Sequence, residues 1–360
     1  MPRRGESIYK RKDGRWEARY VKEITADGKK KYGSVYADSY RAVKEKQQYQ
    51  IVCFNQHKAS KIVKDVADIT SEWLRHIKMR VKPSSYQKYE SLCRNHILLQ
   101  IGRIKLTQLS RSAIETFAEK CLDSGLSVKS VNDVLIVLGL IFEFAEKEYE
   151  INTPKITAIR EERKEARVLT VDEQNRLIAY LTANMNIYYF GMLLSLTTGM
   201  RIGELCALRW EDITEQSISI TKTMQRLKDD SGGTQIVIGS PKSNSSKRII
   251  PLPETVMPFI KKYRKDEGYI LSTSRCIHAE PRILQQKFKA VTDKCHLENV
   301  TFHTLRHTFA TRCVETGFDI KTLSEILGHT DVKTTLNRYV HSSFELKQIN
   351  MNKLINTFAF

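Results

Sequence analysis

The sequence has no run of about 18 apolar residues, and its first sixteen residues, MPRRGESIYKRKDGRW, contain no apolar stretch. A transmembrane helix needs roughly 18 or more consecutive apolar residues, and a secretory signal needs an apolar segment close to the start of the chain. We therefore expect a cytoplasmic protein that has no membrane partner.

The seven cysteines are far apart in the sequence, their number is odd, and no two of them form a CxxC pair. Disulfide frameworks and zinc knuckles need paired, closely spaced cysteines. The cysteines are therefore expected to be reduced thiols that mostly fill hydrophobic cores. The sequence also has no internal repeat and no low-complexity segment.

Two signatures of phosphate chemistry are missing as well. There is no GxxxxGK[ST] loop for a nucleotide and no dense cluster of carboxylates for a pair of magnesium ions. We expect no cofactor and no metal.

Positive charge is the most informative feature that is present. Lys and Arg number 59 against 41 acidic residues, which gives a net charge of +18 and a pI near 9.5. A balance this basic favours a polyanionic partner, because each neutralised phosphate releases condensed counterions. The alternatives are a solubilising surface or an anionic membrane surface. The hydrophobic fraction of 41% is that of a globular protein, and 360 residues predict two or three domains.

Residues 1–55 are expected to form the first domain. They carry 14 basic and 7 acidic side chains up to residue 50. Alternating residues and an Asp-Gly turn predict three short strands followed by a helix over 39–54. Basic and aromatic side chains, Tyr9 and Arg11 among them, interleave over the sheet, which is therefore expected to present a DNA-binding face. The residues predicted for that face are Arg15, Trp16, Arg19 and Tyr20. Alternatively, Trp16 and Tyr20 form a small core under the sheet, and both interpretations can hold because a strand has two faces.

Two further domains are expected, separated from the first and from each other by linkers at 55–63 and 160–167. Residues 64–150 carry apolar residues at helical spacing over 65–79, 84–99, 110–124 and 127–148, which predicts a four-helix domain. Residues 168–360 predict a mixed domain with strands near 218–224, 235–238 and 248–252 and helices over most of the remainder. The fold class is thus multidomain, mainly α with small β-sheets (α+β).

Three segments of the last domain contain the candidate chemistry: TTGMRIGELCALRWEDI (197–213), TFHTLRHTFATR (301–312) and LGHTDVKTTLNRYVH (327–341). In the second, His303 and Arg306 lie three residues apart on one helix and so project from the same face. In the first, Arg201 opens a helix, where the macrodipole disfavours a cation, which points to an anionic ligand or to pairing with a nearby glutamate. Each signal is weak by itself.

Together the segments resemble the tyrosine recombinase (phage integrase) family. That family has an Arg in a TG-x-R-x-x-E-L element, a hairpin Lys, an H-x-x-R, a G-H and a Tyr near the end of the chain. The matching residues occur here in that order over about 140 positions and are Arg201, Lys242, His303, Arg306, His329 and Tyr339. The resemblance implies that 64–150 is a SAM-like core-binding domain and that 1–55 is the arm-type DNA-binding module of a mobile-element integrase.

The same residues can be assigned roles from their chemistry. Two arginines able to fork onto non-bridging oxygens suit a phosphodiester that gains charge on attack, which assigns Arg201 and Arg306. The phenol of Tyr339 must lose a proton as it attacks, so it needs a base such as His303 or His329. The resemblance favours His303 as the base, with His329 binding the phosphate.

The remaining roles concern the leaving oxygen and the support of the site. Lys242 fits the general acid that protonates the 5′-oxygen, with Lys247 as the alternative, and Glu204 is expected to orient an active-site side chain. Because the phosphotyrosyl bond conserves the energy of the phosphodiester, rejoining needs neither ATP nor a metal.

The resemblance also implies the partners: double-stranded DNA at core and arm sites, a homotetramer on that DNA, an excisionase and a host DNA-bending protein, in the cytoplasm of a bacterial host. An amphipathic stripe beyond Tyr339 (Leu346, Ile349, Leu354, Ile355) is expected to dock on a neighbouring protomer, or else on its own domain. Two other functions remain open, a type IB topoisomerase and a non-catalytic architectural DNA-binding protein. Prophage and conjugative-transposon origins are not distinguished.

Overall fold

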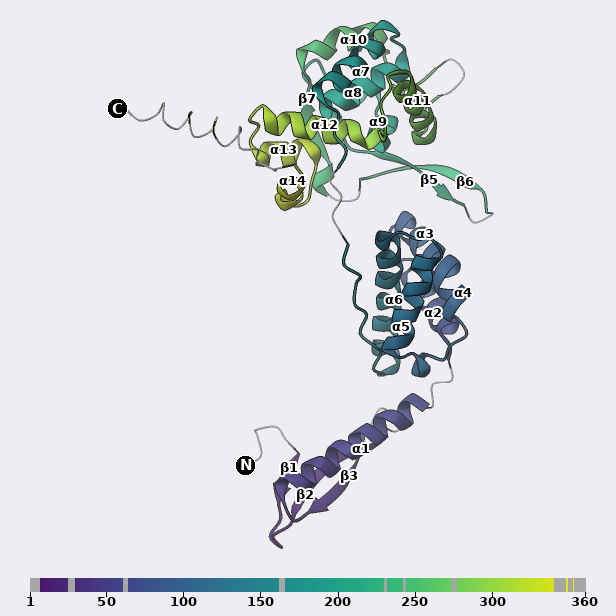
Figure 1. The fold of residues 1–360 in the computed structure, drawn as a ribbon, viewed down its shortest axis with the longest axis vertical. Coiled ribbons are helices and arrows are strands. Elements are labelled where there is room, and N and C mark those ends of the chain that lie inside the picture. The colour runs from purple at the N-terminus through teal and green to yellow at the C-terminus, as the bar shows by residue number, and fades with distance from the viewer. Residues whose placement is uncertain are drawn as a thin grey trace, which may run out of the picture. The chain divides into compact units, whose positions relative to one another are not determined.

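The computed structural model describes residues 7–24, 30–60, 64–161, 166–229, 232–241, 244–273 and 277–339, together with 348 and 352. The chain divides into two compact units, Met1–Glu162 and Arg163–Phe360. Small sheets and many helices (Figure 1) confirm the mainly α, α+β fold class expected from the sequence. In the part of the chain that is described, no helix is both long and apolar enough to cross a membrane.

The first unit begins with a three-stranded antiparallel sheet in the order β1-β2-β3, covered on one face by a helix. Its elements are β1 (Ile8–Lys10), β2 (Trp16–Ile24), β3 (Lys30–Ala37) and α1 (Tyr40–Ser60). The small core between sheet and helix holds Ile8, Ala18, Ala37 and Val43. The helix was expected to end near residue 54 and to be followed by a linker. It continues to Ser60 because residues 55–60 include no proline or glycine to stop it.

Helices make up the rest of the first unit, in the places that the apolar spacing predicted. They are α2 (Val66–Ile77), α3 (Pro83–Leu92), α4 (Leu98–Ile101), α5 (Arg111–Asp123) and α6 (Val128–Tyr149), with a π-helical turn over Cys93–Ile97 between α3 and α4. Lys64 Nζ lies 2.6 Å from Glu72 Oε1 and 2.7 Å from Tyr149 Oη, so the segment before α2 is tied to the end of α6. The hydrogen bond to Glu72 raises the pKa of Lys64.

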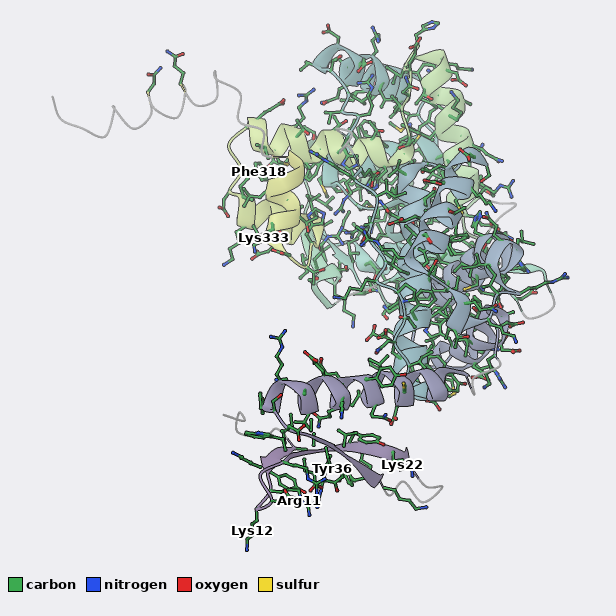
Figure 2. The ribbon with its side chains drawn as sticks, turned by 60° about the horizontal axis from the view of Figure 1, so that its bottom comes forward. Arg11, Lys12, Lys22, Tyr36, Phe318 and Lys333 are labelled. Carbon is green, nitrogen blue, oxygen red and sulfur yellow. The ribbon has the colours of Figure 1, made fainter. Side chains whose placement is uncertain are left out.

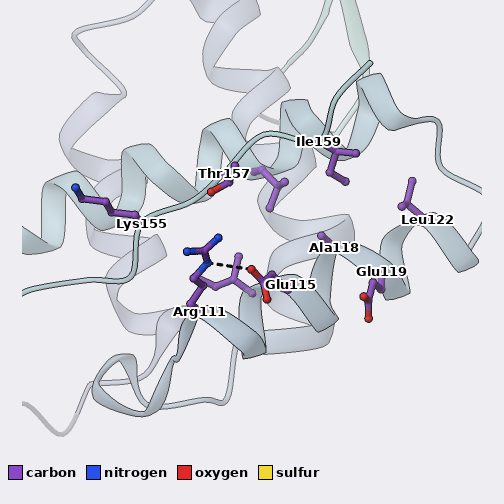
Figure 3. Close-up of a pocket in the computed structure, with 10 residues that line it drawn as sticks. Arg111, Glu115, Ala118, Glu119, Leu122, Lys155, Thr157 and Ile159 are labelled. Carbon is purple, nitrogen blue, oxygen red and sulfur yellow. Dashed lines mark hydrogen bonds and ion pairs between the residues drawn. The ribbon is translucent and has the colours of Figure 1, made fainter. Parts of the chain in front are cut away.

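Packing of the helical core continues beyond residue 150. Ile156 and Ile159 lie against the core, and the Asn132 amide both donates to the Ile159 carbonyl and accepts from its N–H, each at 2.8 Å. A cavity of about 190 Å³ lies between α5, α6 and this segment (Figure 3), with the Arg111–Glu115 ion pair among its lining residues. The segment that follows α6 is thus part of the helical core as far as Ile159.

The second unit combines helices with two separate two-stranded sheets, β4–β7 and β5–β6. Its elements are α7 (Val171–Ala183), α8 (Ile187–Thr198), α9 (Ile202–Ala207), β4 (Ser217–Ile220), β5 (Thr223–Lys228), β6 (Thr234–Gly239), β7 (Arg248–Pro251), α10 (Met257–Tyr263), α11 (Pro281–Lys294), α12 (Phe302–Glu315), α13 (Ile320–Leu327) and α14 (Val332–Tyr339). The single strand expected near 218–224 is two strands, of which β5 pairs with β6 in a separate hairpin. One large core runs from Leu169 to Leu305.

Candidate active site

A pocket of about 540 Å³ lies where the first turn of α9, strand β5, the loop before β7 and the segment between α13 and α14 meet. Figure 1 shows α12, α13 and α14 side by side, in agreement with the contacts between them. The pocket is lined by Arg201, Glu204, Thr223, Gln225, Pro241, Ser246, Gly328, His329, Thr330 and Thr334. Three of the residues predicted from the sequence, Arg201, Glu204 and His329, are therefore brought together although they are up to 128 positions apart.

Arg306 reaches this region from α12 with only 2% of its surface exposed. Its Nη1 donates to the Gly199 carbonyl at 2.9 Å, and its Nη2 donates to the Leu327 carbonyl at 2.8 Å. Gly199 caps the C-terminus of α8, and Leu327 is the last residue of α13. Helix C-termini carry partial negative charge and unpaired carbonyls. The C-terminal ends of α8 and α13 therefore stabilise the Arg306 guanidinium and offset the free-energy cost of burying its charge.

Gly199 leaves no room for a side chain. Its φ is +67°, and an added Cβ would lie 2.4 Å from the Phe309 ring. The left-handed conformation turns the chain from α8 into the segment that carries Arg201. This explains why a glycine stands directly ahead of the Met200-Arg201 pair.

His329 is placed by the left-handed glycine cap that ends α13. Its Nε2 lies 2.9 Å from Arg306 Nη2, and its Nδ1 lies 2.8 Å from the hydroxyl of Thr335 on α14. His329 therefore joins the end of α13 to both α12 and α14.

Glu204 is the centre of a buried charge cluster, with 2% of its surface exposed. It accepts from the Arg201 backbone N–H at 2.9 Å and from Arg201 Nη1 at 2.8 Å. Arg248 contacts both of its oxygens, at 3.1 and 2.8 Å. Burial by itself would raise the pKa of Glu204, but the hydrogen bonds and charge of Arg248, assisted by Arg201, lower it to about 2. The carboxylate thus neutralises the cation at the start of α9.

Arg248 is the residue of this cluster that the sequence analysis missed. Its side chain is 5% exposed, and its Nε donates to the Ile326 carbonyl at the end of α13. A signal was present, because in β7 Arg248 lies on the same side as Ile250, which is buried. A charged residue on the inward side of a strand requires a buried partner.

His303 lies on α12 three residues before Arg306, as predicted, and its side chain is exposed. Its ring stands edge-on to that of His307, with 4.6 Å between the ring centroids. A second pocket, of about 170 Å³, includes both His303 and Arg306 in its lining. Arg306 therefore links the pocket at His303 to the pocket at His329.

The two remaining predicted catalytic residues lie at the edge of what the structure describes. Lys242 is outside the described residues. Tyr339 is the last residue of α14, and its side chain is outside the description. Lys247, the alternative to Lys242, is exposed next to Arg248. The amphipathic stripe beyond Tyr339 also lies outside the described residues.

The four residues predicted to bind DNA in the first unit lie on two faces of the sheet. Trp16 packs under the sheet against Tyr40 of α1, with ring centroids 5.3 Å apart, and Tyr20 covers Gly33 on the neighbouring strand. Arg15 and Arg19 are exposed. The four side chains therefore do not share one surface, because alternate residues of a strand face opposite sides. Trp16 is a core residue.

The open face of the sheet, which faces away from α1, carries its own set of aromatic and basic residues. Figure 2 shows Arg11 and Tyr36 on this side. The guanidinium of Arg19 lies over the ring of Tyr9, and that of Arg11 lies over the ring of Tyr36. Glu17, between them, pairs with Arg11 at 2.8 Å. Tyr9 and Arg11 were among the interleaved residues that the sequence indicated for this sheet, whereas Tyr36 was not.

Comparison with known proteins identifies the family. Residues 167–345 match the model described as the phage integrase family, and residues 66–122 match that of the phage integrase N-terminal SAM-like domain. The tyrosine recombinase XerA of Pyrococcus horikoshii is 30% identical over 260 residues, which cover 69% of this chain and 82% of that protein. The ICEBs1 integrase of Bacillus subtilis is 23% identical, covering 76% of this chain and 78% of that protein.

Among solved structures, a fragment of the Tn1549 transposon integrase in complex with a circular intermediate DNA has a TM-score of 0.71 at 22% identity. The match covers 81% of this chain and 99% of that one. A lambda integrase tetramer bound to a Holliday junction has a TM-score of 0.60 at 19% identity, covering 95% and 99%. The chain belongs to the phage integrase family: it is a tyrosine recombinase, an enzyme that cuts and rejoins DNA.

Proposed function

We propose that this tyrosine recombinase integrates and excises a mobile element by joining two specific DNA sites through a 3′-phosphotyrosyl bond at Tyr339. The observation that carries the proposal is the pocket in which Arg201, Glu204 and His329 meet, with Arg306 hydrogen-bonded to His329. The similarity to the integrases of ICEBs1 and Tn1549 supports a mobile element as the source of the DNA.

In this proposal the two arginines bind the scissile phosphate. Arg201 is 36% exposed and lines the pocket, so its guanidinium is accessible to a phosphate oxygen. Arg306 is held by two carbonyls and by His329, which sets its guanidinium in one orientation before DNA arrives. Preorganised cations of this kind stabilise the charge that develops on a phosphate under attack.

Proton transfer is assigned to the remaining residues. An unperturbed phenol has a pKa of about 10 and is protonated at neutral pH, so Tyr339 needs a base as it attacks. His303, exposed beside Arg306, takes that role. The 5′-oxygen leaves with a proton from Lys242, for which Lys247 is the alternative.

The proposed partners are double-stranded DNA at core and arm sites and three further copies of this chain on that DNA. The tetrameric lambda integrase of similar fold supports the tetramer. Recombination of this kind also calls for an excisionase and a host protein that bends DNA, which would set its direction.

The open face of the N-terminal sheet is proposed to bind the arm sites. Arg19→Ala should weaken binding of the full chain to a duplex taken from the ends of the element by several-fold. The slope of log K against log salt should fall by about 1, because one phosphate contact is lost. Fluorescence anisotropy over a series of salt concentrations measures both quantities.

Arg41→Ala is the matched control for this measurement. Arg41 lies on α1, its side chain is 90% exposed, and its loss removes the same charge. Equal salt slopes for Arg19→Ala and Arg41→Ala would contradict binding by the open face.

The function as a whole is tested by trapping the covalent intermediate. The full chain is incubated with EDTA and duplexes that carry a nick just 3′ of the candidate cleavage position, so that the released fragment diffuses away. We expect protein shifted by attached DNA on a denaturing gel. After nuclease and trypsin digestion, mass spectrometry should find a nucleotide on the peptide YVHSSFELK, residues 339–347, whose only tyrosine is Tyr339.

The other outcomes separate the rival functions. A nucleotide on a different peptide would contradict Tyr339 as the nucleophile. Covalent attachment and plasmid relaxation without the joining of two defined sites would support a type IB topoisomerase. Salt-sensitive DNA binding without any covalent product would support an architectural protein.

A further inference from the structure

Thr335 has a buried hydroxyl next to the proposed site, and no role has been assigned to it so far. It lies on α14 with none of its surface exposed, whereas the preceding residues Val332, Lys333 and Thr334 are all exposed. Its Oγ1 is 2.8 Å from Nδ1 of His329. Thr335 lies four residues before Tyr339, so the two residues occupy the same face of α14, one turn apart.

The hydrogen bonds of His329 determine which of its nitrogens carries the proton. An arginine guanidinium can only donate hydrogen bonds, so Arg306 Nη2, at 2.9 Å, requires an unprotonated Nε2 on His329. In a neutral imidazole the proton is then on Nδ1. That N–H points at Thr335, whose hydroxyl oxygen accepts it. His329 is therefore an acceptor toward Arg306 and a donor toward Thr335.

We propose that Thr335 is a positioning residue for recombination: its hydroxyl holds His329 in the Nδ1–H form and thereby ties the helix of Tyr339 to the guanidinium of Arg306. The inference rests on the proposed function, because it takes Arg306 as the phosphate ligand and Tyr339 as the nucleophile. Thr335 would act through the side chain of His329 and would not itself contact the DNA.

The arrangement makes the site depend on where α14 is docked. If α14 shifts, the Nδ1–H of His329 loses the Thr335 hydroxyl as its acceptor, and the form with the proton on Nδ1 is less favoured. When Nε2 carries the proton, two N–H donors, one from His329 and one from Arg306, point at each other. The hydrogen bond between Arg306 Nη2 and His329 Nε2 is then lost. Placement of the tyrosine helix and orientation of the phosphate ligand are thus one coupled event. A partner that fixes the tautomer of a histidine commonly affects activity strongly, as in hydrolase triads.

The first measurement reads the tautomer directly in the DNA-free full chain. Histidine is labelled with nitrogen-15, the His329 signals are assigned by their loss in His329→Gln, and proton–nitrogen correlation spectra are recorded at about pH 8. We expect the Nδ1–H form in the wild type and in Thr335→Ser, which keeps the hydroxyl. Thr335→Val, which keeps the shape and loses the hydroxyl, should show the Nε2–H form or a mixture.

The second measurement is the rate of covalent attachment to the nicked duplex. Thr335→Val should lower it by about 10- to 100-fold, the usual scale for loss of an orienting partner, and Thr335→Ser should restore most of it. Thr308→Val is the matched control. Thr308 is also fully buried, and its hydroxyl accepts from the Leu169 N–H and donates to the Thr304 carbonyl, but it lies outside both pockets. It should leave the tautomer and the rate unchanged.

Each outcome decides the inference. An Nε2–H form in the wild type, or an unchanged tautomer in a folded Thr335→Val, overturns the contact. A changed tautomer with a cleavage rate equal to that of Thr308→Val overturns the positioning role. If the wild type forms no covalent product at all, the proposed function fails, whereas the tautomer in the DNA-free chain still decides the contact between Thr335 and His329.

Discussion

Tyr339→Phe is expected to reduce covalent attachment to DNA by at least about 10⁴-fold, the scale on which enzymes respond to removal of a nucleophile. The substitution keeps the ring and removes only the oxygen that would attack phosphorus. DNA binding should be retained because the proposed phosphate ligands Arg201 and Arg306 are unchanged. The measurement is the rate at which DNA-shifted protein appears on a denaturing gel, with binding followed separately by anisotropy.

Tyr263→Phe is the matched control. Its hydroxyl donates to the Met185 carbonyl at 3.1 Å, on a side of the second unit that does not line the site pocket. It should attach to DNA at the wild-type rate. Covalent product from Tyr339→Phe at more than a trace would show that another side chain is the nucleophile, since phenylalanine has no group that can form the bond.

Glu204→Gln is expected to lower the free energy of unfolding by about 3 to 5 kcal/mol, the usual cost of breaking a buried ion pair by removing one partner. Arg248 would remain 5% exposed with no counter-charge, and Arg201 would lose its partner at the start of α9. Urea unfolding of the second unit, followed by circular dichroism, measures the change.

Glu211→Gln provides the comparison, because the Glu211–Arg209 pair is largely exposed, at 44% and 39%. Exposed pairs contribute roughly 0 to 1 kcal/mol, so this variant should unfold close to the wild type. Similar losses in the two variants would mean that the charge cluster around Glu204 contributes no more than a surface pair.

The pH dependence of the same comparison follows from the lowered pKa of Glu204. Above its ordinary value of 4.5 the carboxyl is ionised in both the folded and the unfolded chain, so its full stabilisation is present. As the pH falls below 4.5 the unfolded chain takes up the proton first, and the stabilisation declines until it is lost near the folded value of about 2. The gap in stability between wild type and Glu204→Gln should therefore narrow over that range. A gap that stayed constant down to pH 2 would contradict the lowered pKa.

Local patterns predicted most of the elements and the family. Apolar spacing placed the helices α2, α5 and α6 to within a few residues, because one helix face must be buried whatever it packs against. The five motif elements from Arg201 to Tyr339 indicated a tyrosine recombinase, and the family comparison confirms it. Boundaries were less accurate at residues 55–60, which were predicted to belong to a linker and continue α1.

Other features followed from contacts distant in sequence. The alternation in β2 showed that Trp16 and Arg19 face opposite sides, but only packing against Tyr40 of α1 determined which side is closed. The split of the expected strand at 218–224 came from pairing with two different partners, β6 and β7. The alternating pattern of one segment does not show which other strands that segment will pair with.

The sequence by itself determined the class of enzyme, the elements and the residue types of the candidate site, because these follow from spacing and side-chain chemistry along the chain. Only the tertiary structure decided how those side chains engage one another. It buried Arg306 against the ends of α8 and α13, gave Glu204 a second arginine in Arg248, and placed Thr335 against His329. The physical reason is that hydrogen bonds and ion pairs between distant segments depend on burial and geometry, which exist only once the chain has folded.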